Sequence, residues 1–267
     1  MSQPYLIVAH PGHELMVHGW VEETRPRVAI ITDGSGRTGV SRIGSSERIL
    51  NAAHAASGNV WGVMSDPAFY QKILDGEVDS FTTLARQLGD ELTESKPPYV
   101  AGDAREGFNP THDVCRMMID AAVRIARRNG AEVGNYAFFL FAPHTKAPRD
   151  GAICKTLTSD EMQRKVTAAT SYPELASEVE AVFTGTSRNL FAQHPDLAAM
   201  IGASYDGISE QALAFECLVP ADRLPNSNDE KPFYELYGER HVAAGTYARA
   251  IRYREHVQPI EHALAAL

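Results

Sequence analysis

Residues 5–14 read YLIVAHPGHE, and this stretch determines the fold that the sequence predicts. Residues 5–9 are all apolar, a pattern typical of a β-strand that is buried on both faces in a parallel sheet. The run stops at His10-Pro11-Gly12, where turn-forming residues predict a loop. A short helix is expected next, over residues 15–24. The chain therefore opens with a strand, a loop and a helix, which is the start of a βαβ unit.

The same alternation of strands and helices continues along the chain. Further strands are predicted over residues 27–32, 136–141 and, at the edge of a sheet, 214–220. Helices are predicted over residues 45–56, 81–94, 112–129, 159–169 and 172–183. Strands separated by helices favour an α/β fold with a doubly wound, mostly parallel sheet. We expect a single domain over residues 1–267, with a helical elaboration at its C-terminal end.

Composition limits the classes of partner. The chain has 267 residues, of which 44% are hydrophobic, enough for a sizeable core. Its formal net charge of −9 argues against nucleic acid or an anionic membrane as partner. We find no signal peptide at the N-terminus and no apolar run near the ~20 residues that span a bilayer. Cys115, Cys154 and Cys217 are widely spaced and are predicted to be buried thiols, which favours a cytoplasmic protein.

Histidines stand where a parallel sheet places its ligands. Ligands bind open parallel sheets at the carboxyl ends of the strands. His10 and His13 follow the first strand, and imidazole is a common zinc ligand. His112 lies in a polar turn that opens a predicted helix. From the residues alone, a core or surface role remains open for the first pair, and a solvated helix start for His112.

Two motifs carry a resemblance to a known family. Residues 9–14 read AHPGHE and residues 109–112 read NPTH. The chain resembles the PIG-L (LmbE-like) superfamily of metal-dependent de-N-acetylases, which typically show AHPDDE and HPDH. Thr32-Asp33-Gly34 after the second strand agrees with this family, as do Lys165, Ala168 and Tyr172 in a later helical region. The resemblance covers roughly residues 4–185.

The resemblance implies a Rossmann-like fold and a metal site. His10 and His112 keep the two histidine positions of the family's ligand set, while His13 stands at its aspartate position. The ion expected is zinc, with another divalent transition metal as the alternative. Three neutral histidines form a sound zinc site with a coordination position open to water.

The sequence departs from the family in the catalytic centre. Gly12 stands where the family has its general base, and Asn109 replaces the first histidine of HPDH. An amide at Asn109 can still donate a hydrogen bond to an oxyanion, but it cannot carry protons.

Another carboxylate must act as base if hydrolysis survives. Glu14 and Asp33 are the first candidates, with Glu106, Asp113 or no base at all as the remaining ones. The alternatives are ordinary: Glu14 would orient a metal ligand, Asp33 would cap a turn, and Asp113 would lie in the first turn of a helix.

The resemblance therefore implies a zinc-dependent hydrolase of the de-N-acetylase type. Its substrate would be an N-acyl amino sugar or a related small polar amide. One alternative is a metal-binding member without hydrolytic activity, in a sugar-binding or assembly role. Another is a protein that uses the metal for a different acyl-transfer or lyase reaction. A homo-oligomer is left open.

Overall fold

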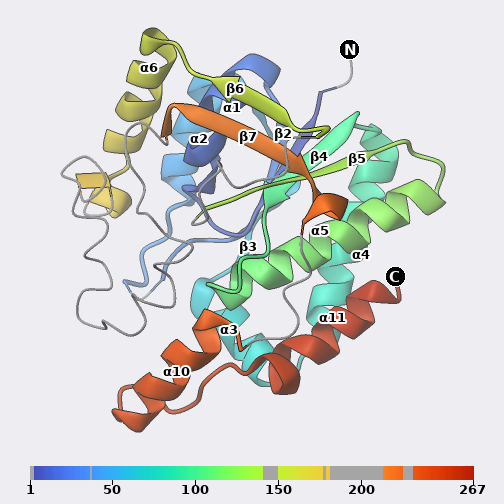
Figure 1. The fold of residues 1–267 in the computed structure, drawn as a ribbon, viewed down its shortest axis with the longest axis vertical. Helices are drawn as coiled ribbons and strands as arrows, with labels where there is room; N and C mark the ends of the chain where they lie inside the picture. Colours follow the sequence, from blue (N-terminus) through green and yellow to red (C-terminus); the bar gives the residue numbers. More distant parts are fainter. Residues whose placement is uncertain (1–2, 37, 141–149, 177–178, 181–212, 225–230) are drawn as a thin grey trace.

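A computed structural model of the chain describes residues 3–36, 38–140, 150–176, 179–180, 213–224 and 231–267 (Figure 1). Residue 141 of the predicted strand 136–141 and residues 177–178 and 181–183 of the predicted helix 172–183 lie outside these ranges. Within the described residues, no helix is long and apolar enough to cross a membrane.

The described strands form one seven-stranded sheet in the order β3-β2-β1-β4-β5-β7-β6. They are β1 (Tyr5–Val8), β2 (Arg27–Thr32), β3 (Ala56–Met64), β4 (Tyr99–Asp103), β5 (Gly134–Phe138), β6 (Ile153–Thr156) and β7 (Phe215–Pro220). The first five strands pair in parallel, and β7 runs antiparallel to both β5 and β6. The doubly wound, mostly parallel α/β sheet expected from the sequence is therefore confirmed.

Helices connect these strands and continue beyond the last one. The longer ones are α1 (His18–Thr24), α2 (Ile43–Ala52), α3 (Asp66–Leu74), α4 (Val78–Ser95), α5 (Pro110–Arg128), α6 (Ser159–Thr170), α10 (Phe233–Ala243) and α11 (Gln258–Ala265). Short helical turns are η1 (His13–Val17), η3 (Pro173–Leu175), η5 (Ala221–Arg223) and η6 (Tyr253–Val257). The segments α10, η6 and α11 form the helical C-terminal elaboration that the sequence predicts.

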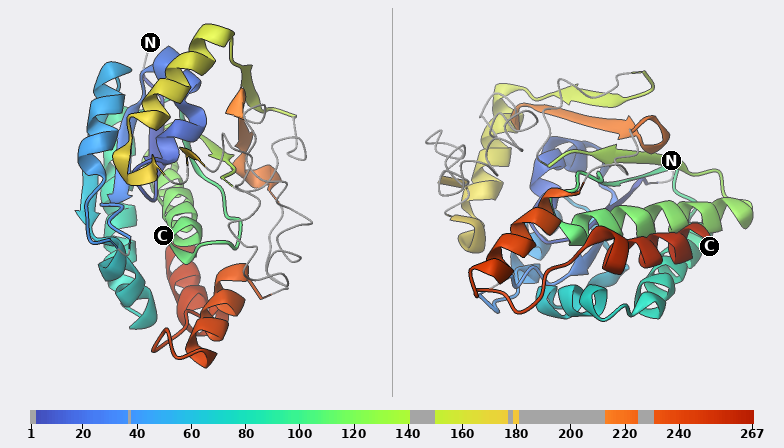
Figure 2. Two further views of the ribbon diagram at one scale, coloured as in Figure 1. Left: turned by 90° about the vertical axis from the view of Figure 1, so that its left-hand side faces the viewer. Right: turned by 60° about the horizontal axis from the view of Figure 1, so that its bottom comes forward.

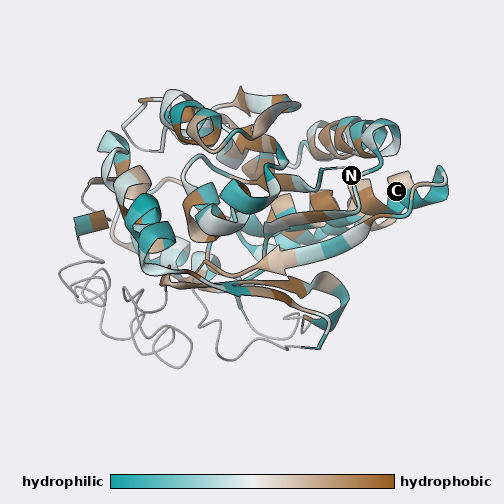
Figure 3. Cartoon of the chain, turned by 90° about the horizontal axis from the view of Figure 1, so that it is seen from above, coloured by the Kyte–Doolittle hydropathy of each residue, from teal (hydrophilic) through white to brown (hydrophobic). Residues whose placement is uncertain are grey.

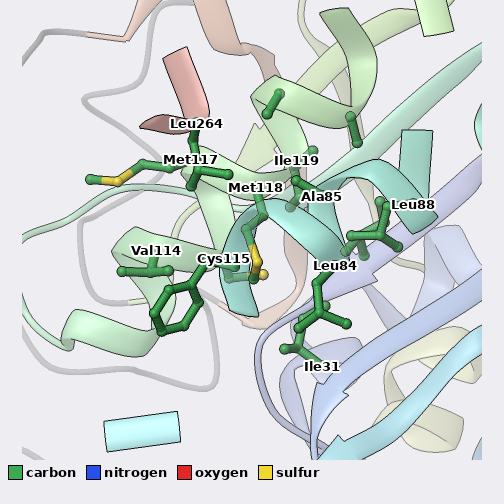
Figure 4. Packing of buried hydrophobic residues seen from close by; sticks show 14 of the residues in the cluster. Ile31, Leu84, Ala85, Leu88, Val114, Cys115, Met117, Met118, Ile119 and Leu264 are labelled. Atoms are coloured by element: carbon green, nitrogen blue, oxygen red, sulfur yellow. The ribbon is translucent and has the colours of Figure 1, made fainter. Parts of the chain in front are cut away.

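The sheet is the middle layer of three (Figure 2). Side chains alternate along β1, as they must on a strand: Ile7 packs in one cluster with residues of α4, α5 and α11, and Val8 in another with residues of α1 and α2. Figure 4 shows the first cluster, in which Leu84 and Leu88 of α4 lie beside Met118 and Ile119 of α5. Brown and teal residues alternate along the helices in Figure 3, as expected of helices with one apolar face.

Several elements differ from the sequence-based expectation. The strands β3, β4 and β6 and the helix α3 were not predicted. β3 contains two glycines and several exposed residues, and its register against β2 shifts twice, so it lacks a period-two pattern. The strand predicted over 214–220 forms as β7, but β6 lies outside it, so its expected edge position is wrong.

The expectation of three free thiols is also wrong. Cys154 of β6 lies directly opposite Cys217 of β7, and the two form a disulfide. Only Cys115 is a buried free cysteine. A pair so distant in sequence is brought together by the antiparallel pairing of β6 and β7. The cysteine argument for a reducing compartment therefore loses its support.

Candidate functional site

The three candidate histidines lie at β1, where the order in which strands are added to the sheet reverses. The chain passes from β1 to β2 on one side, whereas β4 pairs with the other side of β1. Such a switch point is where open α/β sheets bind ligands. His10 and His13 follow β1, and His112 lies in the first turn of α5, shortly after β4.

The three imidazoles form one cluster. The ring centroids of His13 and His112 are 4.6 Å apart, those of His10 and His112 are 5.0 Å apart, and those of His10 and His13 are 5.2 Å apart. Every pair meets edge to face. The structure therefore brings together the residues that the two motifs single out, although they lie about a hundred residues apart in sequence.

Two buried aspartates hold two of these rings. His10 Nδ1 lies 2.9 Å from Asp66 Oδ1, and His13 Nδ1 lies 3.0 Å from both carboxylate oxygens of Asp103. An ionised carboxylate can only accept hydrogen bonds, so Nδ1 carries the hydrogen in both rings. In the neutral form, Nε2 then has the lone pair. Carboxylates in this position are the usual partners of histidines that bind metals.

Both aspartates are themselves anchored by backbone amides. Asp103 is completely buried, and its Oδ2 accepts a hydrogen bond of 2.7 Å from the backbone N–H of Ala9. Asp66 Oδ2 accepts one of 2.8 Å from Gly36. Although burial opposes ionisation, the hydrogen bond from His10 and its charge lower the pKa of Asp66 well below its usual range. Both carboxylates are thus fixed acceptors.

The pKa values of His112 and His13 are shifted in opposite directions. Burial, together with His13 and His10, holds the pKa of His112 well below its usual value, so this ring is neutral. Burial also lowers the pKa of His13, but the charge and hydrogen bond of Asp103 outweigh it, and the net shift is upward.

Rings that lie close together do not by themselves form a metal site. Among the described residues, no group of three or more histidine, cysteine, aspartate or glutamate side chains is arranged so that it could hold a metal ion as it stands. The donor chemistry of three imidazoles suits zinc.

Both carboxylate oxygens of Glu14 accept hydrogen bonds inside the protein. Its side chain is buried, with 1% of the residue exposed. Its Oε2 accepts a hydrogen bond of 2.7 Å from the N–H of Gly12, and its Oε1 accepts one from the hydroxyl of Ser46. Burial raises its pKa, and these bonds partly oppose the rise. This placement suits the alternative in which Glu14 shapes the loop that carries His13.

Position 12, where the family resemblance predicts a carboxylate base, is packed by an apolar side chain. Gly12 has φ +105° and ψ −21°, a backbone conformation that favours glycine. A Cβ built on it would lie 2.6 Å from Leu175 Cδ1 and 3.9 Å from the ring of Tyr172. Leu175 of η3 therefore fills the space that a side chain at position 12 would occupy.

Asp33 serves the turn after β2. Its Oδ1 accepts hydrogen bonds from the backbone amides of Ser35, at 2.9 Å, and Asp66, at 3.3 Å. Since Asp66 in turn holds His10, Asp33 lies behind the histidine cluster. Its Oδ2 makes no hydrogen bond among the described residues.

Asn109 is the N-cap of α5. Its Oδ1 accepts a hydrogen bond of 2.8 Å from the backbone N–H of Thr111, and the first residue of the helix is Pro110. These are strong helix-start signals, and they explain why α5 begins here. The cap places the Asn109 amide three residues before His112.

Glu106 and Asp113 shape the loop between β4 and α5. Asp113 Oδ1 accepts hydrogen bonds from the backbone amides of Glu106 and Gly107, and burial raises its pKa to about 7. Glu106 Oε2 accepts a hydrogen bond from the N–H of Leu140. Both carboxylates therefore bind backbone amides of this loop and its neighbour.

A buried ion pair supports the segment behind the cluster. Lys165 Nζ lies 2.8 Å from Glu216 Oε1 and donates to the backbone oxygen of Met16 at 2.9 Å. Glu216 in turn accepts hydrogen bonds from the N–H groups of Gly19 and Trp20 in the first turn of α1. The motif lysine thus fixes the backbone that follows His13.

Asp66 and Asp103 are the site residues that the sequence reasoning missed. Each is the acidic residue at or just after the end of a parallel strand, β3 or β4. That position is the available signal, but it becomes visible only when both strands have been predicted.

Comparison with solved structures identifies two deacetylases and one conserved protein that are similar to this chain. The A40926 pseudoaglycone deacetylase Dbv21 has a TM-score of 0.50 at 17% identity, covering 82% of this chain and 96% of that one. A triple mutant of the deacetylase in the teicoplanin biosynthetic pathway has a TM-score of 0.49 at 13% identity, covering 70% and 91%. The conserved protein TT1542 from Thermus thermophilus has a TM-score of 0.46 at 14% identity, covering 86% and 99%. No protein-family model and no curated protein matches the sequence.

At 17% identity, the likeness to Dbv21 shows a shared fold. The likeness covers 82% of this chain and nearly the whole length of that deacetylase. The fold expected from the two motifs is therefore confirmed.

Proposed function

We propose that this chain is a zinc-dependent hydrolase of the de-N-acetylase type, a divergent member of the PIG-L (LmbE-like) superfamily. Its substrate would be an N-acyl amino sugar or a related small polar amide. The observation that carries the proposal is the cluster of His10, His13 and His112 at the switch point of the sheet, with ring centroids 4.6–5.2 Å apart. The fold shared with a deacetylase supports the same reaction class.

The residues of the cluster suit a zinc ion chemically. His10, His13 and His112 would hold it, and Asp66 and Asp103 would fix the tautomers of the first two through Nδ1. When bound, zinc supplies a Lewis acid that acidifies a water molecule and polarises an acyl carbonyl. Another divalent transition metal is the alternative, because imidazole also suits other metals of the first transition row.

Asn109 would stabilise the oxyanion that develops on the acyl group. Its Oδ1 is engaged by the N-cap bond to Thr111, so the hydrogen-bond donor of the amide is Nδ2. One such donor is worth about 10²–10³ in kcat where it has been removed from other enzymes.

Asp33 is the better of the two first candidates for the base. Both oxygens of Glu14 accept hydrogen bonds, from Gly12 and Ser46, whereas only Oδ1 of Asp33 does so among the described residues. Asp33 binds the backbone N–H of Asp66, so Asp66 would lie between it and His10. The general base is therefore the least favourably placed group of the proposed site. We therefore expect slow hydrolysis, since general-base catalysis typically contributes about 10²–10⁴-fold.

The packing of Leu175 on Gly12 favours a second candidate function. A metal-binding protein that has lost hydrolysis, or that uses the metal for another acyl-transfer or lyase reaction, does not need a carboxylate at this position. In such a protein the vacated space can be filled by an apolar side chain, as it is here.

Release of acetate tests the proposal. Chain stripped with a chelator and then reloaded with zinc is incubated with a panel of N-acetyl amino sugars. We expect acetate release that requires zinc and is lost in His112→Ala but kept in His262→Ala, an exposed histidine of α11. Zinc-loaded protein that releases no acetate from any member of the panel contradicts hydrolysis and favours the second candidate.

A further inference from the structure

Helix α3 contacts both halves of the candidate site, although neither motif includes it. Asp66, its first residue, accepts the hydrogen bond from His10 Nδ1. Tyr70 lies one turn further along, on the same face of the helix. Its hydroxyl donates a hydrogen bond of 3.1 Å to Asn109 Oδ1. One helix thus links a histidine after β1 to the amide after β4.

The two bonds to Asn109 determine the orientation of its amide. A backbone N–H can only donate, so the atom that accepts from Thr111 must be the carbonyl oxygen. The Tyr70 hydroxyl reaches the same oxygen. Both lone pairs of Oδ1 are then occupied, and the NH₂ group is the end of the side chain that can meet a substrate oxygen. Burial raises the pKa of Tyr70 to about 12, so the phenol stays protonated at neutral pH.

We propose that Tyr70 is a positioning residue: its hydroxyl holds Asn109 Oδ1 and thereby fixes Nδ2 as a donor to the developing oxyanion. This role rests on the proposed hydrolysis. The N-cap bond alone leaves the amide free to rock about the Thr111 N–H, whereas two donors on one oxygen hold its plane. Fixed donors are what oxyanion stabilisation requires, because a donor that must reorient during the reaction contributes less.

The test compares Tyr70→Phe with Tyr99→Phe, a matched loss of a hydroxyl whose partner is Trp20 Nε1. Acetate release should show kcat lowered roughly 10-fold in Tyr70→Phe, with KM unchanged, and no change in Tyr99→Phe. Asn109→Asp keeps an acceptor for the cap but removes the donor, and should cost about 10²–10³-fold. In that background Tyr70→Phe should cost less than about 2-fold, since the donor that it positions is gone.

A second readout does not depend on activity. The Nδ2 hydrogens of Asn109 are assigned in an amide nitrogen–proton NMR spectrum by their loss in Asn109→Asp. Tyr70→Phe should shift this pair of signals, and Tyr99→Phe should leave it in place. If the wild type releases no acetate, the proposed function fails and the NMR pair alone decides on the Tyr70 contact. An unshifted pair in Tyr70→Phe overturns the inference, as does an equal loss of kcat with and without the Asn109 amide.

Discussion

Replacing Gly12 by aspartate introduces the carboxylate that the family resemblance places at this position. The structure predicts that the single change fails and that a second change rescues it. A Cβ at Gly12 would lie 2.6 Å from Leu175 Cδ1, so the free end of that side chain would have to move to admit it. The backbone there has φ +105°, which is strained for any side chain.

The cost follows from these two features. A non-glycine residue in a sparsely populated backbone region costs about 1–3 kcal/mol. An extra side chain in a packed space costs about another 1–3 kcal/mol. Gly12→Asp should therefore lower the free energy of unfolding by about 2–6 kcal/mol, a large part of the typical 5–15 kcal/mol. Adding Leu175→Ala should return about 1–3 kcal/mol of this, because it removes the clash and leaves the strain.

Denaturant unfolding and acetate release measure the two halves of this prediction. The control is Gly245→Asp, where φ is +73° and nothing lies within 4 Å of the added Cβ, so it reports strain alone. With zinc bound, Gly12→Asp/Leu175→Ala should hydrolyse an N-acetyl substrate about 10²–10⁴-fold faster than Leu175→Ala. Wild-type stability in Gly12→Asp would refute the packing argument. A folded, zinc-loaded double variant with no gain in rate would refute the view that this position is where a base acts.

Three further changes probe separate parts of the structure. Asn109→Asp should keep the stability of the wild type in thermal unfolding, since aspartate also caps helices, and a large loss would contradict the role of residue 109 as a cap. In the same variant kcat should fall about 10²–10³-fold, because the amide donor is gone. Lys165→Met leaves the buried Glu216 carboxylate without its cation and should lower the free energy of unfolding by about 3–5 kcal/mol in denaturant. The control, Lys155→Met near the surface, should cost at most about 1 kcal/mol. Equal losses in the two variants would show that the buried pair has no special role. Reduction of the Cys154–Cys217 disulfide should lower the free energy of unfolding by about 2–4 kcal/mol. It should also raise the number of titratable thiols in the unfolded protein from one to three per chain. Three thiols before reduction would show that the bond does not form.

Strands with a continuous apolar run could be predicted from sequence, and strands interrupted by glycine or polar residues could not. β1 and β2 are continuous apolar runs, and the prediction for β2 matches its bounds. β3 lies at the edge of the sheet, so exposed polar residues and glycines interrupt its pattern. β4 reads YVAGD, so its apolar run stops after three residues at Gly102 and Asp103.

The same reason limits what could be predicted of the site. The histidines stand in motifs beside a clear strand and a clear helix, so their grouping could be expected. Asp66 and Asp103 follow strands without a clear pattern, so their link to the rings required the structure. The contact of Leu175 with Gly12 joins segments far apart in sequence and depends on how η3 packs, for which the sequence carries no local signal.

Zinc affinity tests the central claim most directly. Protein stripped of metal is titrated with zinc by calorimetry, and the loaded protein is analysed for its metal content. We expect about one zinc ion per chain, no binding in a His10→Ala/His112→Ala double variant, and affinity lowered about 10–100-fold in Asp103→Asn, which removes only the carboxylate behind His13. Zinc that persists in the double histidine variant, or a folded wild type that binds none, would contradict the account.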